Sequence, residues 1–202
     1  MSYDDDSFDY TIVHAGLHHC ASPHRGVCEM LRVARKGIAV FEARDSLLMR
    51  LAVHIGLSDE YELAPVAERG AGGVRNSSIP NAIYRWTEKE FKKTVNSYIP
   101  QYQHDFTFFY GYRAPGRRLD MSSFALKSLA SNAIPIAIPL LEKMAPRQGN
   151  SFAMFASKRG RLQPWLRSNE GVIEPDIEHL STKYKTGKWD SSARCPVHDG
   201  LA

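Results

Sequence analysis

The pattern of apolar and polar positions over residues 8–56 predicts a strand, a helix, a strand and a helix in close succession. Residues 8–16 are rich in β-formers and end in a glycine, and residues 38–42 form a short apolar run typical of a buried strand. Apolar residues at helical spacing over 23–37 and 46–56, each followed by a glycine, predict the two helices. Such alternation is typical of an α/β fold with a parallel sheet.

The middle of the chain has a different pattern. Residues 64–80 contain three glycines and two prolines, which predicts a long loop. Thr87 and Glu90 have the spacing of a capping box, so a helix is expected to begin there and to end before Pro100. The Ala64–Pro80 stretch is therefore expected to connect two regular parts of the fold.

The second half predicts two further strands and a long helix. Residues 105–112 and 150–157 are aromatic-rich runs with strand character. Apolar residues from about 121 to 144 predict a helix between them, kinked by two prolines. Beyond Trp165 no periodicity stands out, so residues 168–202 are predicted to be a polar, partly ordered tail.

The composition fits an ordinary globular domain of 202 residues, with 43% hydrophobic and 24% charged side chains. Three cysteines suit a reducing compartment better than a secreted disulfide framework. The acidic start does not have the pattern of a signal peptide, and no apolar run approaches the roughly twenty residues of a membrane span. We therefore expect a cytoplasmic protein that does not enter a membrane.

Charge is unevenly placed along the chain. Residues 1–62 carry a net charge of −4 and residues 63–202 a net charge of +8. A basic half can indicate nucleic-acid binding, but here the basic side chains are dispersed and form no stripe. A solvated basic face is the preferred interpretation, and nucleic acid is not an expected partner.

Five short stretches together resemble the second half of a class I S-adenosylmethionine-dependent methyltransferase. They are Ser7–Tyr10, Leu17–His19, Pro23, Glu29–Val33 and Arg35–Ile38. The resemblance implies a partial doubly wound, Rossmann-like α/β sheet, in which parallel strands are followed by an antiparallel pair. It implies that residues 1–167 form the C-terminal part of a methyltransferase-like domain, and that S-adenosylmethionine is the cofactor.

The chain departs from the family where the cofactor is held. The family's glycine-rich loop after its first strand has no counterpart, because Gly70, Gly72 and Gly73 follow no strand that leads into a helix. The first strand of this chain would also be an open edge of the sheet. We therefore expect impaired activity from the chain alone, and self-association or pairing with a missing N-terminal half through that edge.

Candidate site residues follow from the ends of the predicted strands, where ligands bind in open α/β sheets. The resemblance places the cofactor beside Gly16, Leu17, His18 and His19. His19 is the candidate general base, because imidazole titrates near neutral pH. The alternative is that both histidines are structural turn residues.

Further candidates could bind the methyl acceptor, which is expected to be a small polar molecule or metabolite. Glu42 suits a hydroxyl and Arg44 a carboxylate or phosphate, although the two could equally belong to a cap and salt-bridge cluster. Arg75, Asn76 and Tyr84 could form a lid, or else a surface loop. The alternative function is a non-catalytic binding or assembly module made of the same half-domain.

No metal site is predicted. His14, His18, His19 and Cys20 do not form a complete zinc set, and Cys195 with His198 supplies at most two ligands. A nucleophile elbow of the glycine-x-serine-x-glycine type is also absent from the sequence. Methyl transfer remains the reaction that the resemblance implies, and the lack of a catalytic triad does not count against it, because the reaction needs mainly alignment of the acceptor with the methyl donor.

Overall fold

The computed structural model describes residues 2–113, 133 and 136–184. Its centre is a four-stranded sheet in the order β1-β2-β5-β4, built from β1 (Phe8–His14), β2 (Ala34–Ala43), β4 (Phe106–Gly111) and β5 (Ser151–Ser157). β1 and β2 run parallel, whereas β5 is antiparallel to both β2 and β4. The predicted fold class is thus confirmed: parallel strands are followed by an antiparallel pair.

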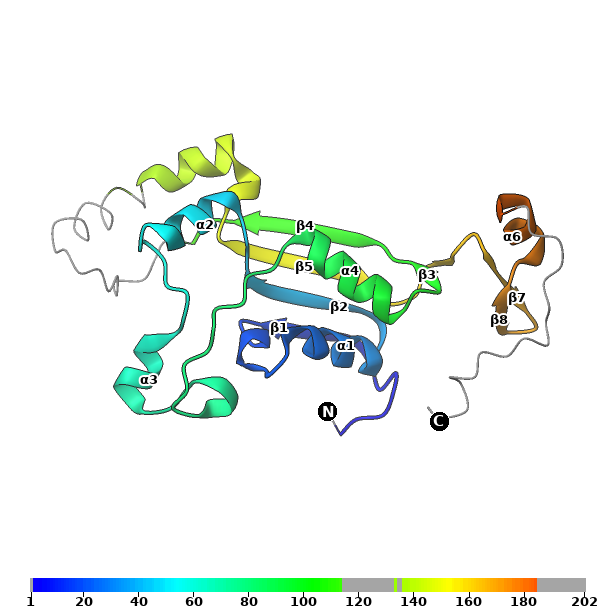
Figure 1. The fold of residues 1–202 in the computed structure, drawn as a ribbon, viewed down its shortest axis with the longest axis horizontal. Helices are drawn as coiled ribbons and strands as arrows, with labels where there is room; N and C mark the ends of the chain where they lie inside the picture. Colours follow the sequence, from blue (N-terminus) through cyan, green and yellow to red (C-terminus); the bar gives the residue numbers. More distant parts are fainter. Residues whose placement is uncertain (1, 114–132, 134–135, 185–202) are drawn as a thin grey trace.

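Helices α1 (Pro23–Val33) and α4 (Glu88–Tyr98) cover one face of the sheet (Figure 1). Val27 and Leu31 of α1 and Phe91 and Val95 of α4 are buried there. Both helices begin as the sequence predicts, with the hydroxyl oxygens of Ser22 and Thr87 accepting the Arg25 and Glu90 amides. The strands contribute alternate residues to the same core, including Val40, Phe152 and Met154.

α1 ends earlier than the sequence pattern predicts. The chain passes directly from Val33 into β2 at Ala34, so the predicted stop at Gly37 is wrong. Gly37 instead lies within β2, where a Cβ would come 2.6 Å from the Ala156 carbonyl oxygen. Pairing with β1 and β5 on both sides outweighs the local signal, because Gly37 is opposite both Tyr10 and Ser157.

The segment predicted to be one long loop contains a short helix, so that prediction is wrong in part. α3 (Leu63–Arg69) ends on Gly70, which adopts the left-handed backbone conformation (φ 65°) that favours glycine. A 3-10 turn, η2 (Val74–Asn76), follows it. Helix α2 (Leu47–His54) precedes this segment, within the range 46–56 predicted for it, and Ser46 caps its start.

The C-terminal part is more regular than its sequence suggests. Strands β7 (Leu166–Asn169) and β8 (Val172–Pro175) form a hairpin, and α6 (Ile177–Tyr184) follows it. Figure 1 shows this unit apart from the main sheet, beyond the small pair of β3 (Tyr102–Gln103) and β6 (Arg161–Leu162). The division at residue 167 remains a prediction.

The predicted long helix lies partly outside the described residues. Residues 136–144 are helical, and the predicted start near Met121 falls outside the described range. The 3-10 turn η3 (Pro146–Gln148) then leads into β5. Among the described residues, no helix is long and apolar enough to cross a membrane.

Candidate functional site

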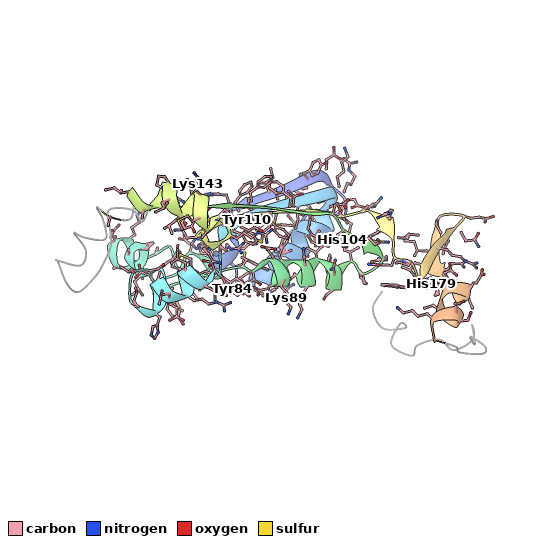
Figure 2. All side chains as sticks on the ribbon, turned by 90° about the horizontal axis from the view of Figure 1, so that it is seen from above. Tyr84, Lys89, His104, Tyr110, Lys143 and His179 are labelled. Atoms are coloured by element: carbon pink, nitrogen blue, oxygen red, sulfur yellow. The ribbon has the colours of Figure 1, made fainter. Side chains whose placement is uncertain are left out.

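The site lies where β1, β2 and β4 end, because these three strands point the same way. In Figure 1 this is the left end of the sheet. The 3-10 turn η1 (Leu17–His19) follows β1 at this edge. In the side-chain view, Tyr84 and Tyr110 lie toward this end and His104 toward the other (Figure 2). The edge predicted from strand order is therefore where the candidate residues gather.

Glu42 holds η1 in place from the end of β2. Its Oε1 accepts the backbone amides of Gly16 and Leu17, each at 2.8 Å, and its Oε2 lies 3.0 Å from His18 Nδ1. Glu42 is buried, with 5% of its surface exposed. The carboxylate thus faces the turn, and three hydrogen bonds balance the cost of burying its charge.

His18 lies between two carboxylates. Besides the Glu42 contact, its Nε2 is 3.5 Å from Glu62 Oε1. The hydrogen bond that His18 donates to Glu42 and the negative charges of both glutamates raise the pKa of His18, although burial acts in the opposite direction. Each ring nitrogen of His18 therefore faces a carboxylate.

His19 is the more accessible histidine of the turn, with 41% of its side chain exposed. Its Nδ1 lies 2.6 Å from Nδ2 of Asn81, and its Nε2 lies 3.8 Å from Glu62 Oε2. The orientation of the Asn81 amide sets the tautomer of His19: with Nδ2 as donor to Nδ1, the ring proton is on Nε2. If the Asn81 amide turned so that Oδ1 faced His19, the ring proton would lie on Nδ1. Nε2 could then accept a proton.

Glu62 and Asn81 are site residues that the sequence did not reveal. A short antiparallel contact joins their segments, in which Glu62 donates its amide to Asn81 and Ile83 donates to Glu60, each at 2.9 Å. Asn81 is fully buried, and its Nδ2 also contacts the Gly72 carbonyl at 3.2 Å. No periodicity or motif marks either residue, since their position depends on the folding of the connecting segment.

Tyr84 belongs to a second group on the same side. Its hydroxyl donates to Glu90 Oε1 of α4, and His24 Nε2 of α1 lies 3.0 Å from the same oxygen. Burial and the Glu90 contact raise the pKa of the Tyr84 phenol above its ordinary value. Tyr84 is therefore neutral near pH 7 and hydrogen-bonded within the fold.

Arg44 turns toward β4 and β5. Its guanidinium lies 4.4 Å from the Tyr110 ring centre and 4.8 Å from that of Phe152. Glu88 Oε1 is 3.5 Å from Arg44 Nη1, close enough for an ion pair but outside hydrogen-bond geometry. The side chain is 12% exposed, so ring faces and one carboxylate provide most of its contacts.

Arg75 and Asn76 lie on η2, which packs beside η1. Both are exposed, and both adopt left-handed backbone conformations, with φ of 54° and 60°. The structure thus brings Gly16, Leu17, His18, His19 and Glu42 together, with η2 next to them. Tyr84 and Arg44 have separate contacts at the same end of the sheet.

An apolar cavity of about 220 Å³ opens at the end of β4. Leu48 and Ala52 of α2, Tyr112 and Leu141 line it, among other residues. It offers space for a small group beside the ends of the strands, but no residue predicted from the sequence to bind a substrate lines it.

Comparison with known proteins supports the resemblance found in the sequence. Residues 1–41, which end within β2, match the family described as a methyltransferase domain. The resemblance to class I methyltransferases is therefore confirmed for this part of the chain. No curated protein matches the sequence.

Solved structures that the chain matches include a proposed methyltransferase from Bacillus halodurans. It is 13% identical, with a TM-score of 0.40, and the match covers 79% of this chain and 74% of that one. A second match comes from a complex of the Haloferax volcanii Trm112 methyltransferase activator with a proposed methyltransferase: 12% identity, a TM-score of 0.40, and coverage of 80% and 58%. The YcgJ protein of Bacillus subtilis is 14% identical, with a TM-score of 0.39 and coverage of 80% and 68%.

The turn fits S-adenosylmethionine on one side only. The amides of Gly16 and Leu17 are already bonded to Glu42, and the Leu17 side chain is buried in the core. The His19 side chain remains accessible. Since no glycine-rich turn follows any strand among the described residues, these residues offer one wall and not a complete cofactor cradle.

Proposed function

We propose that this chain takes part in S-adenosylmethionine-dependent methyl transfer to a small polar acceptor, and that its activity alone is impaired. The observation that carries the proposal is the η1 turn: it lies in the segment that matches a methyltransferase domain, at the sheet edge where ligands bind in such folds. The proposal of impaired activity is supported by the incomplete cofactor cradle that residues 2–113, 133 and 136–184 provide.

When bound, S-adenosylmethionine would supply a methyl group on a positively charged sulfur. The residues of this chain would position the turn, accept a proton and contact the acceptor. Glu42 positions the turn through its three hydrogen bonds. His19 would accept a proton at Nε2 from the acceptor once Asn81 presents its oxygen to Nδ1. Arg75, Asn76 and Tyr84 are the proposed contacts for the polar groups of the acceptor, and Arg44 for a carboxylate or phosphate.

Equilibrium dialysis with radiolabelled S-adenosylmethionine tests the cofactor part of this proposal. We expect weak but saturable retention by the full chain, displaced by S-adenosylhomocysteine. His19→Ala should weaken it about tenfold, whereas His179→Ala in α6 should leave it unchanged. Absence of retention at millimolar ligand would overturn the cofactor assignment for this chain.

A second candidate function is assembly through β1, in which the chain binds another copy of itself. β1 is an edge strand, with Tyr10 and Ile12 63% and 71% exposed. Antiparallel pairing centred on Thr11 would place Tyr10 of each copy opposite Ile12 of the other. Such pairing would satisfy the free backbone edge and cover apolar surface in one step.

A further inference from the structure

We propose that His18, His19 and Glu62 form a binding site for a divalent transition-metal ion, with zinc as the best match. One ligand atom from each residue lies within 4.8 Å of the others. Two imidazoles and one carboxylate are a known ligand set for zinc that leaves a coordination position open. The inference goes beyond methyl transfer and does not rest on it.

The three ligand atoms lie within 4.8 Å of one another and must draw closer together to bind zinc. His18 Nε2 is 3.5 Å from Glu62 Oε1, and His19 Nε2 is 3.8 Å from Glu62 Oε2. Ligand atoms at ~2.1 Å from a tetrahedral zinc ion lie about 3.4 Å from one another. Because Glu62 is 27% exposed at the start of α3, its carboxylate has room to make this adjustment.

The contact that His18 makes with Glu42, behind the proposed metal, already suits a histidine ligand. Its Nδ1 lies 3.0 Å from buried Glu42 and its Nε2 3.5 Å from Glu62 Oε1, so with Nδ1 donating to Glu42, Nε2 is the nitrogen placed to share a metal ion with Glu62. A carboxylate behind a histidine ligand fixes its orientation and strengthens it as a donor. A divalent ion at Nε2 would take the place of a proton between the imidazole and Glu62, and it would balance the charges of Glu42 and Glu62.

Asn81 provides the matching contact for His19. It is fully buried, and its Oδ1 has no hydrogen-bond partner among the described residues. Metal binding through His19 Nε2 requires a proton on Nδ1, which Oδ1 would accept if the amide turned. That turn gives up the Nδ2 hydrogen bonds to the Gly72 carbonyl and to Glu62 Oε2, and it provides the orphaned oxygen with a partner.

The test is zinc titration of the chelator-treated full chain by calorimetry, with cobalt(II) absorbance to report tetrahedral coordination. All proteins carry Cys195→Ser and His198→Ala, so that this second cysteine–histidine pair does not contribute. We expect one zinc ion per chain. His19→Ala and Glu62→Gln should each weaken binding about tenfold or more, with unchanged circular dichroism.

His14→Ala and Glu60→Gln, which change a nearby exposed histidine and a nearby exposed glutamate, are matched controls and should bind zinc normally. His18→Ala is informative only if it folds, because His18 is 8% exposed. No zinc uptake, or equal uptake by His19→Ala, Glu62→Gln and the parent, would overturn the site. No S-adenosylmethionine is present, so the result is independent of the proposed function.

Discussion

Glu42 and Leu17, 25 positions apart, are joined by a buried hydrogen bond of 2.8 Å from the Leu17 amide to Glu42 Oε1. The same oxygen accepts the Gly16 amide. Through this one carboxylate, the end of β2 fixes the turn that follows β1. Glu42 therefore positions the candidate site and does not face an open pocket.

Replacement of Glu42 should destabilise the fold. Glu42→Ala leaves two amides without their acceptor, at an expected cost of about 3 kcal/mol, because hydrogen bonds to buried charged groups are strong. Glu42→Gln keeps an oxygen for the amides and should lose less. Urea unfolding monitored by circular dichroism measures both, with exposed Glu60→Gln as the control. A Glu42→Ala protein as stable as the parent would contradict the positioning role.

The aromatic core predicts a contrast between two phenylalanines on neighbouring strands. Phe152 of β5 is 1% exposed and stacks against Tyr110 and Phe108, whereas Phe109 of β4 is 59% exposed. Phe152→Ala should cost about 3–5 kcal/mol, and Phe109→Ala less than about 1 kcal/mol. Thermal unfolding of the two variants checks the order, and similar losses would show that the covered face of the sheet is assigned wrongly.

Much of this fold follows from local sequence signals, whereas part of the site does not. The capping pair at Thr87 and Glu90 and the apolar run of β2 act on their own neighbours, so both elements were predictable. Glu62 and Asn81 come together only because residues 60–62 pair with 81–83 across the connecting segment. Polar residues placed by such pairing leave no periodic signal.

The C-terminal hairpin was missed for a related reason. Its turn residues Glu170 and Gly171 have positive φ, but the strands are four residues each and mostly exposed, so they lack an apolar pattern. The Gly16–His19 turn was located correctly from the resemblance, but its amide donors could not be assigned from sequence. Their partner, Glu42, becomes evident only in the three-dimensional structure.

Asp6 gives the fold a pH dependence at the acid end. Its carboxylate lies 2.6 Å from Lys158 Nζ and 2.8 Å from Arg159 Nη2, joining the segment before β1 to the end of β5. The Lys158 hydrogen bond lowers the pKa of Asp6 below its ordinary 3.8. The stabilisation is thus complete above about pH 4 and is lost as the pH falls through the folded-state pKa.

Asp6→Asn tests this dependence. Asp6 has φ 57°, and asparagine tolerates the left-handed conformation, so the backbone should be kept. We expect the variant to be less stable by up to about 1 kcal/mol at pH 7, as for other exposed ion pairs, and the difference to shrink toward pH 3. Unfolding curves at both pH values provide the measurement. A difference that grows on acidification would contradict the sign.

If copies of the chain assemble through β1, the molecular mass in solution should depend on the exposed side chain of Ile12. If copies pair at this edge, Ile12→Lys should lower the dimer fraction at least tenfold, because it places a charge within the paired apolar surface. Ile79→Lys changes an isoleucine that is 66% exposed outside the sheet and should have no effect. Light scattering after size exclusion reports the mass, and a monomeric parent at high concentration would contradict assembly.

The most direct test of the central claim is titration of the ¹⁵N-labelled chain with S-adenosylmethionine, followed by amide chemical shifts. Proposed binding at the end of β1 predicts saturable shifts at Gly16, Leu17, His18 and His19, carried to Glu42 through its hydrogen bonds to the turn. Amides of the distant β7–β8 hairpin should not move. No shifts at millimolar cofactor, or shifts confined to other parts of the chain, would contradict the account.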